Sequence, residues 1–305
     1  MSRLTAFLVP LQRALAIAAI IAQGGIAVTG SIVRVTGSGL GCPTWPECVP
    51  GSIVPVEHPD VAALHQWVEF GNRTLFGVIG IITGLCLIAA VLNKPRRRRV
   101  ITLAAIQVGG VLAQAVIGGA TVRLGLVWWS VSVHFMVSMV LVWFAVLLLR
   151  SLSEGDGPAR WLVPAGARGL QIVMAVVMYA LLIAGTFVTA AGPHAGDSKT
   201  PRLDVPVPTL AQIHADLLFL FLGMLIAMGF FVRTKAYWVL VGVVVAQGSL
   251  GMVQYWTGVP EVLVSLHVLG AGAVVVATAM LWTSSRERTH EVEVPAAEDQ
   301  ALSKA

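Results

Sequence analysis

The chain has 305 residues, of which 57% are hydrophobic and only 11% are charged. Soluble globular proteins average about 25% charged residues, so this composition excludes an ordinary water-soluble domain. The formal net charge is +5. Its meaning depends on where the basic residues lie relative to the apolar segments.

Eight apolar runs follow one another, each close to the roughly 20 residues that a helix needs to cross a bilayer. They cover residues 11–33, 68–92, 100–120, 129–150, 170–189, 210–232, 237–257 and 262–283. The first run is too long for a signal-peptide core and lacks a small-residue cleavage pattern, so we expect it to remain as a helix. Backbone in lipid must satisfy its own hydrogen bonds, so the sequence predicts an all-α polytopic membrane protein with eight transmembrane helices.

Basic residues are unevenly distributed between the two sets of loops. One set contains the run KPRRRR at 94–99 and most of the other loop lysines and arginines. By the positive-inside rule, both termini are expected on the cytoplasmic side of the cell membrane. The positive charge therefore indicates topology, and nucleic-acid binding is not expected. The charged, alanine-rich segment 286–305 predicts a disordered cytoplasmic tail.

An internal repeat relates the third and fourth apolar runs to the seventh and eighth. A shift of 133 residues places Gln114 on Gln247 and His134 on His267 without a gap. A gap-free match across two apolar runs indicates that two units of similar structure have been joined in tandem.

The rest of each unit matches more weakly. Residues 30–42 align with residues 185–197, with four glycine or valine identities. The sequence therefore predicts two pseudo-repeated four-helix bundles of the same orientation, over residues 1–150 and 151–285. Each bundle is expected to have a pocket at its outer end.

Three histidines lie within or at the rim of the spans, near the outer face in this topology. His214 and His267 come from two different helices of the second bundle. Two neutral imidazoles facing each other across a bundle are the usual way to hold a haem iron on both sides. In the first bundle the repeat gives His134, with Asn72 at the partner position. The alternative for each is a buried histidine with a purely structural role.

The segment HQWVEFGNR at 65–73 opens the second span. On a helix, His65, Glu69 and Asn72 share one face, and Arg73 lies one turn beyond Glu69. One interpretation is an interfacial Glu–Arg pair worth a few tenths of a kcal/mol. The other is a reacting site in which the iron stays open on one side, with a carboxylate close by.

Two cysteines lie in a loop at 35–64 that is rich in glycine and proline. Cys42 and Cys48 fall on the outer side, where disulfides persist, and a bridge would fix the loop as a lid over the first bundle. Two free thiols acting as a redox pair remain the alternative. Cys86 lies within a span and is expected to be a buried apolar residue.

Together these segments resemble the haem A synthase family, whose members convert haem O to haem A for cytochrome oxidase assembly. The resemblance is carried by GSIVRVTGSGLGCPTWPEC, VEFGNR, GGATVRLGL, IHADLLF and SLHVLGAG. It extends from residue 11 to about residue 283. It implies eight helices in two pseudo-repeated bundles, in agreement with the internal repeat.

The resemblance also implies the site residues. A haem b cofactor would be bound by His214 and His267, and the substrate haem O would bind in the first bundle at His134, with Glu69 nearby. Many members have a histidine where this chain has Asn72, which is a departure from the family pattern.

The implied reaction oxidises one methyl group of haem O to a formyl group by successive hydroxylations and a dehydration. Molecular oxygen or water, an electron donor not defined by the sequence, membrane lipid and a haem O synthase that hands over the substrate are the expected partners. Arg34, Arg73 and Arg123 lie at the outer rim, where they could pair with haem propionates. Contacts to lipid headgroups are the alternative.

Two other functions fit parts of this pattern. A cytochrome b that exchanges electrons with quinone would explain His214 and His267 but would leave Glu69, His134 and the cysteine loop without a role. A small-solute transporter would suit the duplication, yet many transporters have inverted halves and polar sites at the membrane midplane.

Overall fold

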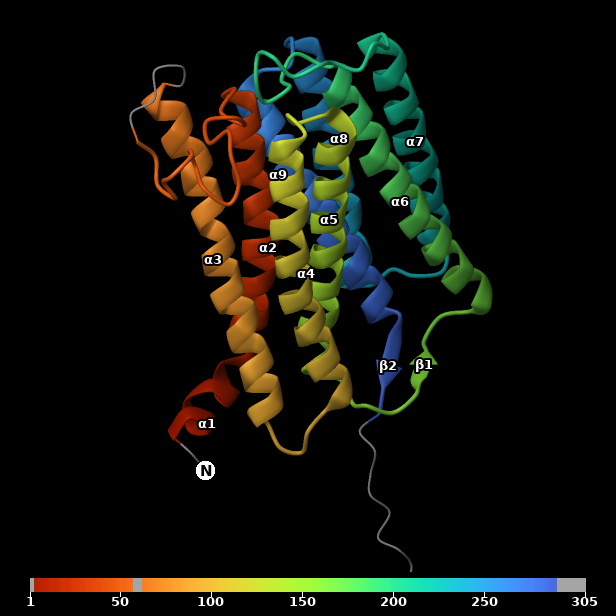
Figure 1. Ribbon diagram of the computed structural model, residues 1–305. Coiled ribbons are helices and arrows are strands. Elements are labelled where there is room, and N and C mark those ends of the chain that lie inside the picture. The colour runs from red at the N-terminus through yellow and green to blue at the C-terminus, as the bar shows by residue number, and fades with distance from the viewer. Residues whose placement is uncertain (1–2, 57–61, 290–305) are drawn as a thin grey trace, which may run out of the picture.

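The computed structural model describes residues 3–56 and 62–289, and eight long helices running side by side dominate it (Figure 1). All eight are long and apolar enough to cross a membrane. Their bounds are α2 Gln12–Val35, α3 Ala63–Leu92, α4 Arg98–Arg123, α5 Trp128–Ser151, α6 Ala165–Ala191, α7 Val207–Met228, α8 Lys235–Trp256 and α9 Glu261–Ser284. The prediction of an all-α polytopic membrane protein with eight spans is confirmed.

Proline sets the start of several of these helices. Pro164, Pro206 and Pro260 directly precede α6, α7 and α9. Proline suits this place because its φ is already near the helical value and the first helical turn needs no N–H donor from it. Helix α3 begins at Ala63, five residues before the apolar run at 68. Residues 65–73 therefore lie on regular helix.

Four short elements lie at the end of the molecule opposite the long loops. Helix α1 (Arg3–Leu8) and the 3-10 turn η1 (Val9–Leu11) lead into α2. Strands β1 (Ala159–Trp161) and β2 (Arg286–Arg288) pair antiparallel, at the bottom of Figure 1.

Strand β2 differs from the disordered tail expected from residue 286 onward. Its backbone groups pair with β1, and the Arg286 guanidinium lies 5.9 Å from the ring of Trp161 and 5.6 Å from that of Trp282. Pairing and stacking explain why these charged residues are ordered. Residues 290–305 of the expected tail lie outside the described residues.

The helices pack in two groups. In the first half, α2, α3, α4 and α5 form a closed ring in which each helix contacts two neighbours. In the second half, α6 packs on α7 and α8 packs on α9, whereas α7 and α8 are in contact over only a short stretch. One apolar cluster spans α2–α5 and a larger one spans α5–α9. Contacts of α9 with α2 and α5 join the halves.

Two buried glutamines connect three helices of the first half. The Gln23 amide donates to Gln107 Oε1 at 3.1 Å, and the Gln107 amide donates to the Leu141 carbonyl at 3.1 Å. Buried polar side chains in lipid-embedded bundles need such partners. These two hydrogen bonds fix the position of α2, α4 and α5 along one another.

The backbone repeats where the sequence repeats. Gly125 and Leu126 both have positive φ, at 67° and 59°, and so do Gly258 and Val259, at 79° and 61°. Positive φ is uncommon for leucine and valine, so the same strained turn twice, between α4 and α5 and between α8 and α9, is a specific coincidence. It supports duplication of a helix-pair unit.

Candidate functional site

His214 of α7 and His267 of α9 face each other in the second half. Their ring centroids are 6.4 Å apart and their planes are inclined by 59°. Each sits in the second or third turn of its helix, at the end of the molecule that carries the long loops. The structure thus brings this predicted pair together across the helix bundle.

Small residues and carbonyl groups position these two rings. His214 Nδ1 lies 3.0 Å from the Leu181 carbonyl oxygen, and Nε2 has no hydrogen-bond partner among the described residues. The Gln247 amide donates to the His267 carbonyl at 2.8 Å. Added Cβ atoms would lie 3.1 Å from His214 Cε1 at Gly185 and 2.9 Å from His267 Cε1 at Gly251. Glycine therefore permits the close approach of both rings.

This arrangement fits a haem iron. Bonds from iron to nitrogen of about 2 Å on each side would place two axial imidazole centres about 6 Å apart, close to the observed separation. Metal-binding histidines usually hydrogen-bond through the other ring nitrogen, as His214 does with Leu181. Among the described residues, no group of three or more His, Cys, Asp or Glu side chains is placed to hold a metal ion.

His134 of α5 occupies the corresponding place in the first half. The Gln114 amide donates to its carbonyl at 3.1 Å, and a Cβ at Gly118 would lie 3.2 Å from its ring. Its Nδ1 is buried without a hydrogen-bond partner in the described part of the chain, as is that of His267. The surroundings of these two histidines therefore repeat closely.

Asn72 stands where the repeat would place a second histidine. Its Oδ1 accepts a hydrogen bond of 2.6 Å from the hydroxyl of Thr29 on α2. An amide is a poor axial ligand for haem iron, so the repeat-related positions of this half hold one imidazole, whereas those of the second half hold two.

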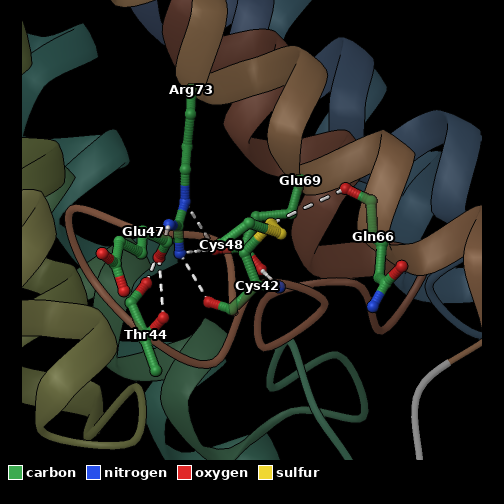
Figure 2. Close-up of polar contacts among 7 residues, drawn as sticks. All are labelled: Cys42, Thr44, Glu47, Cys48, Gln66, Glu69 and Arg73. Atoms are coloured by element: carbon green, nitrogen blue, oxygen red, sulfur yellow. Dashed lines mark hydrogen bonds and ion pairs between the residues drawn. A yellow bond between two sulfur atoms is a disulfide. The ribbon is translucent and has the colours of Figure 1, made fainter. Parts of the chain in front are cut away.

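Glu69 lies deep at the junction between α3 and the lid loop, defined here as residues 36–56 and shown in part in Figure 2. Its Oε2 accepts a hydrogen bond of 2.7 Å from the Cys42 backbone N–H. Its Oε1 accepts from Arg73, one turn farther along α3. Cys42 and Cys48 are bonded in the structure, with an S–S distance of 2.01 Å.

Arg73 uses its whole guanidinium to hold this loop. Its N–H groups donate to Glu69 and to the carbonyls of Cys42, Thr44 and Glu47, at distances between 2.5 and 3.3 Å. Figure 2 shows the side chain reaching from α3 into the loop. Arginine has five N–H donors, and these contacts engage all of them.

The other two predicted arginines also contact backbone carbonyls. Arg34 donates to the carbonyls of His194 and Thr189 at 2.5 and 3.0 Å, and so reaches from α2 into the second half. Arg123 donates to the Trp45 carbonyl at 2.9 Å, with its guanidinium 5.9 Å from the Trp45 ring.

Sequence reasoning missed two further lid contacts. A Cβ at Gly119 would lie 2.5 Å from the Trp45 ring, so the indole packs directly on α4, beside the glycine that faces His134. His65 Nδ1 lies 2.8 Å from the Ser38 hydroxyl. The adjacent glycines of α4 and the tryptophan in a glycine-rich loop were the available signals.

Residues 13–197 match a known family. A model of a cytochrome oxidase assembly protein family, COX15-CtaA, matches residues 13–197. This is more than half of the chain. The chain belongs to this family. The resemblance drawn from the sequence is confirmed.

Several curated relatives of this chain are named heme A synthases. The protein of Shouchella clausii is 28% identical over 167 residues, covering 53% of this chain and 54% of the relative. That of Lysinibacillus sphaericus is 34% identical over 139 residues, covering 45% and 43%. The matched region thus spans about half the length of these relatives. The family match ends before His214 and His267, so their grouping rests on the repeat and on geometry.

Proposed function

We propose that this chain is a haem A synthase, with a haem b cofactor in the second half and haem O as substrate in the first. The observation that carries the proposal is the unequal pair of sites in a duplicated fold. One site has two facing imidazoles. The other has one imidazole, His134, in a half that also holds a buried carboxylate and a fixed lid loop.

His214 and His267 would be the ligands of the haem b iron. A haem with two imidazole ligands has no vacant position at iron and therefore supplies single-electron transfer when bound. Leu181 fixes the ring of His214, and Gly185 and Gly251 let the rings approach. Activity, cofactor and substrate are inferred from this geometry together with the names of the relatives.

The reaction asks for oxidation of one methyl group of haem O. Two hydroxylations give a geminal diol, and loss of water gives the formyl group. The overall change, methyl plus water to formyl, releases four protons and four electrons, which molecular oxygen would take up as the ultimate oxidant, directly or through an electron carrier.

The first half would bind and shield this substrate. His134 would bind the haem O iron, and the lid loop would cover the outer mouth and exclude water. Trp45 packs on α4 at Gly119, next to the glycine that contacts His134. The lid therefore lies beside the position from which His134 would act.

Glu69 would serve as a proton-holding group and would also position the lid. It is 4% exposed and is held through Oε2 by the Cys42 N–H and through Oε1 by Arg73. Its repeat counterpart is an alanine, Ala211. A carboxylate at this place is thus particular to the substrate half.

Arg34 and Arg123 remain candidate partners for haem propionates, because each lies at the rim and keeps guanidinium N–H groups beyond the contacts described above. Arg73 would have to exchange a lid contact to take that role. We further propose that the lid end faces outward from the cell membrane, with both termini cytoplasmic, so that the Cys42–Cys48 disulfide persists.

The test is pigment extraction from a host that makes haem O but no haem A. Expression of this chain should yield haem A. A membrane-inserted chain that carries haem b but leaves haem O unchanged would contradict the proposal and would favour an electron-transferring cytochrome b. A chain without any haem would favour the transporter.

The same assay tests Glu69. Glu69→Ala should keep the resident haem b but stop haem A formation, because the carboxylate lies in the other half from the cofactor. Normal haem A output from this variant would remove its role in the reaction. Asp216→Asn is a suitable control, because Asp216 is an exposed carboxylate on α7.

A further inference from the structure

We propose that the first half gives the iron of its haem substrate a single protein ligand, His134, and that the side-chain amide of Asn72 is a hydrogen-bond donor to the small ligand that occupies the open side. The inference rests on the proposed function only in placing a haem in this half. It concerns the side of the site opposite His134.

Glycines mark where the duplicated fold places its histidines. In three repeat-related positions, an added Cβ would lie 3.2, 3.1 or 2.9 Å from a ring atom, in the pairs Gly118–His134, Gly185–His214 and Gly251–His267. The fourth glycine is Gly30, the counterpart of Gly185, and nothing lies within 4 Å of its added Cβ. A histidine ring thus lies close to the glycine at three of the four positions, and no ring lies beside Gly30.

The side chains around Gly30 account for the missing ring. Asn72 comes from α3, as His214 comes from α7. The Thr29 hydroxyl lies 2.6 Å from Asn72 Oδ1 and 3.1 Å from the Ile26 carbonyl oxygen. A polar pair, hydroxyl and amide, therefore replaces an imidazole at this position.

The second half shows what has been replaced. There His214 Nδ1 lies 3.0 Å from the carbonyl of Leu181, the repeat counterpart of Ile26. The counterpart of Thr29 is Ala184, which has no hydroxyl. Two differences thus distinguish the sites. The first half has Thr29 and Asn72, which are hydrogen-bonded to each other, and the second half has Ala184 and His214 at the matching positions.

The side-chain amide of Asn72 has N–H groups that are not used within the described part of the chain. Its Oδ1 is engaged by Thr29, and no acceptor for its Nδ2 lies among the described residues. The side chain is half-buried. An amide N–H at this position can donate to water or to a diatomic molecule bound at an iron, which an imidazole ligated to that iron could not do.

Two other histidines at this end lie away from the partner position. His65 precedes Asn72 by seven residues on α3, about 10 Å along the helix axis at 1.5 Å per residue. His194 follows α6 in the second half, where its Nε2 lies 3.0 Å from the Val259 carbonyl. His58 lies outside the described residues, and the experiment tests it separately. Among the residues described, Asn72 is therefore the side chain at the partner position of His134.

The test uses carbon monoxide on the full chain, purified with its resident haem b, loaded with haem O and reduced. Haem with two imidazole ligands resists carbon monoxide, whereas haem with one imidazole binds it. We expect uptake at the haem O only, in the wild type and in His58→Ala alike. Absence of uptake in the wild type, or uptake that appears only in His58→Ala, would overturn the inference.

The double variant Thr29→Ala/Asn72→His rebuilds the residues of the second half. It should lose carbon monoxide uptake and gain a second low-spin haem spectrum. Uptake at the wild-type level would show that residue 72 does not face the iron. The low-spin spectrum of the second half reports whether the variant is folded.

Asn72→Leu tests the donor and does not depend on the double variant. It should keep carbon monoxide uptake but raise the C–O stretching frequency, because a hydrogen bond to the bound ligand is lost. An unchanged frequency would remove the donor role. Thr74→Ala, two residues along α3 with an exposed side chain, is the control and should match the wild type.

Pigment analysis of the same preparations separates this inference from the proposed function. Haem A formation by a chain with two low-spin haems would leave the function standing and overturn the inference. Carbon monoxide uptake as expected, without haem A, would leave the open site standing and overturn the function.

Discussion

Glycines on α4, α6 and α8 decide how closely a histidine ring approaches the neighbouring helix. At Gly251 an added Cβ would lie 2.9 Å from His267 Cε1, a distance that real Cβ contacts essentially never show. A methyl group there would have to push the ring away. Residues of this kind carry no chemistry themselves, yet they set the position of a metal ligand.

Gly251→Ala should therefore reduce haem b retention. Alanine favours a helix over glycine by about 1 kcal/mol, so the backbone of α8 should not suffer. The expected result is a lower haem-to-protein ratio after purification, with the chain still folded.

Gly242→Ala is the matched control for this variant. Gly242 lies on the same helix, and nothing lies within 4 Å of its added Cβ. It should retain haem b as the wild type does. Equal retention in both variants would show that the ring of His267 does not depend on Gly251.

The lid loop is the element that distinguishes the two halves. It lacks regular helix and is held by side chains from its neighbours. Arg73 and Glu69 of α3 bind its backbone, Arg123 of α4 binds the Trp45 carbonyl, and the Trp45 ring packs on Gly119. The repeat counterparts of Glu69 and Arg73 are both alanines, so α7 lacks these two anchors at the matching positions.

Gly119→Ala should displace the lid loop, because the added Cβ would lie 2.5 Å from the Trp45 ring. Hydrogen exchange of a peptide covering residues 36–56 should become faster. In Gly109→Ala, on the same helix with nothing within 4 Å, exchange should stay unchanged. Equally slow exchange in both variants would mean that the indole does not fix the lid.

The sequence was sufficient for the spans, because these depend on hydropathy. The repeat spacing singled out His214 and His267, whose ring centroids the structure places 6.4 Å apart. The sequence was insufficient for Arg73, whose partners are loop carbonyls that become neighbours only when the chain folds. The contact of Arg34 with the carbonyl of His194 is of the same kind. The bond between Thr29 and Asn72 joins two helices, and neither residue alone indicates it.

In the whole molecule, the proposed duplication would provide two similar sites that have diverged. The halves meet through α9 against α2 and α5, and their loops meet through the Gly39 N–H, which donates to the Gly196 carbonyl at 2.8 Å. Arg34 adds a second link, from α2 to the loop after α6. Such contacts would hold two haems at a fixed separation, as electron transfer between them requires.

In the proposed function, one half would hold its haem iron between two histidines and the other would not. The most direct measurement is the optical spectrum of the purified full chain in His214→Ala, His267→Ala and His134→Ala. Loss of the low-spin haem b spectrum is expected in the first two variants, and its retention in the third. An unchanged low-spin spectrum in both His214→Ala and His267→Ala, or its loss in His134→Ala alone, would contradict the account.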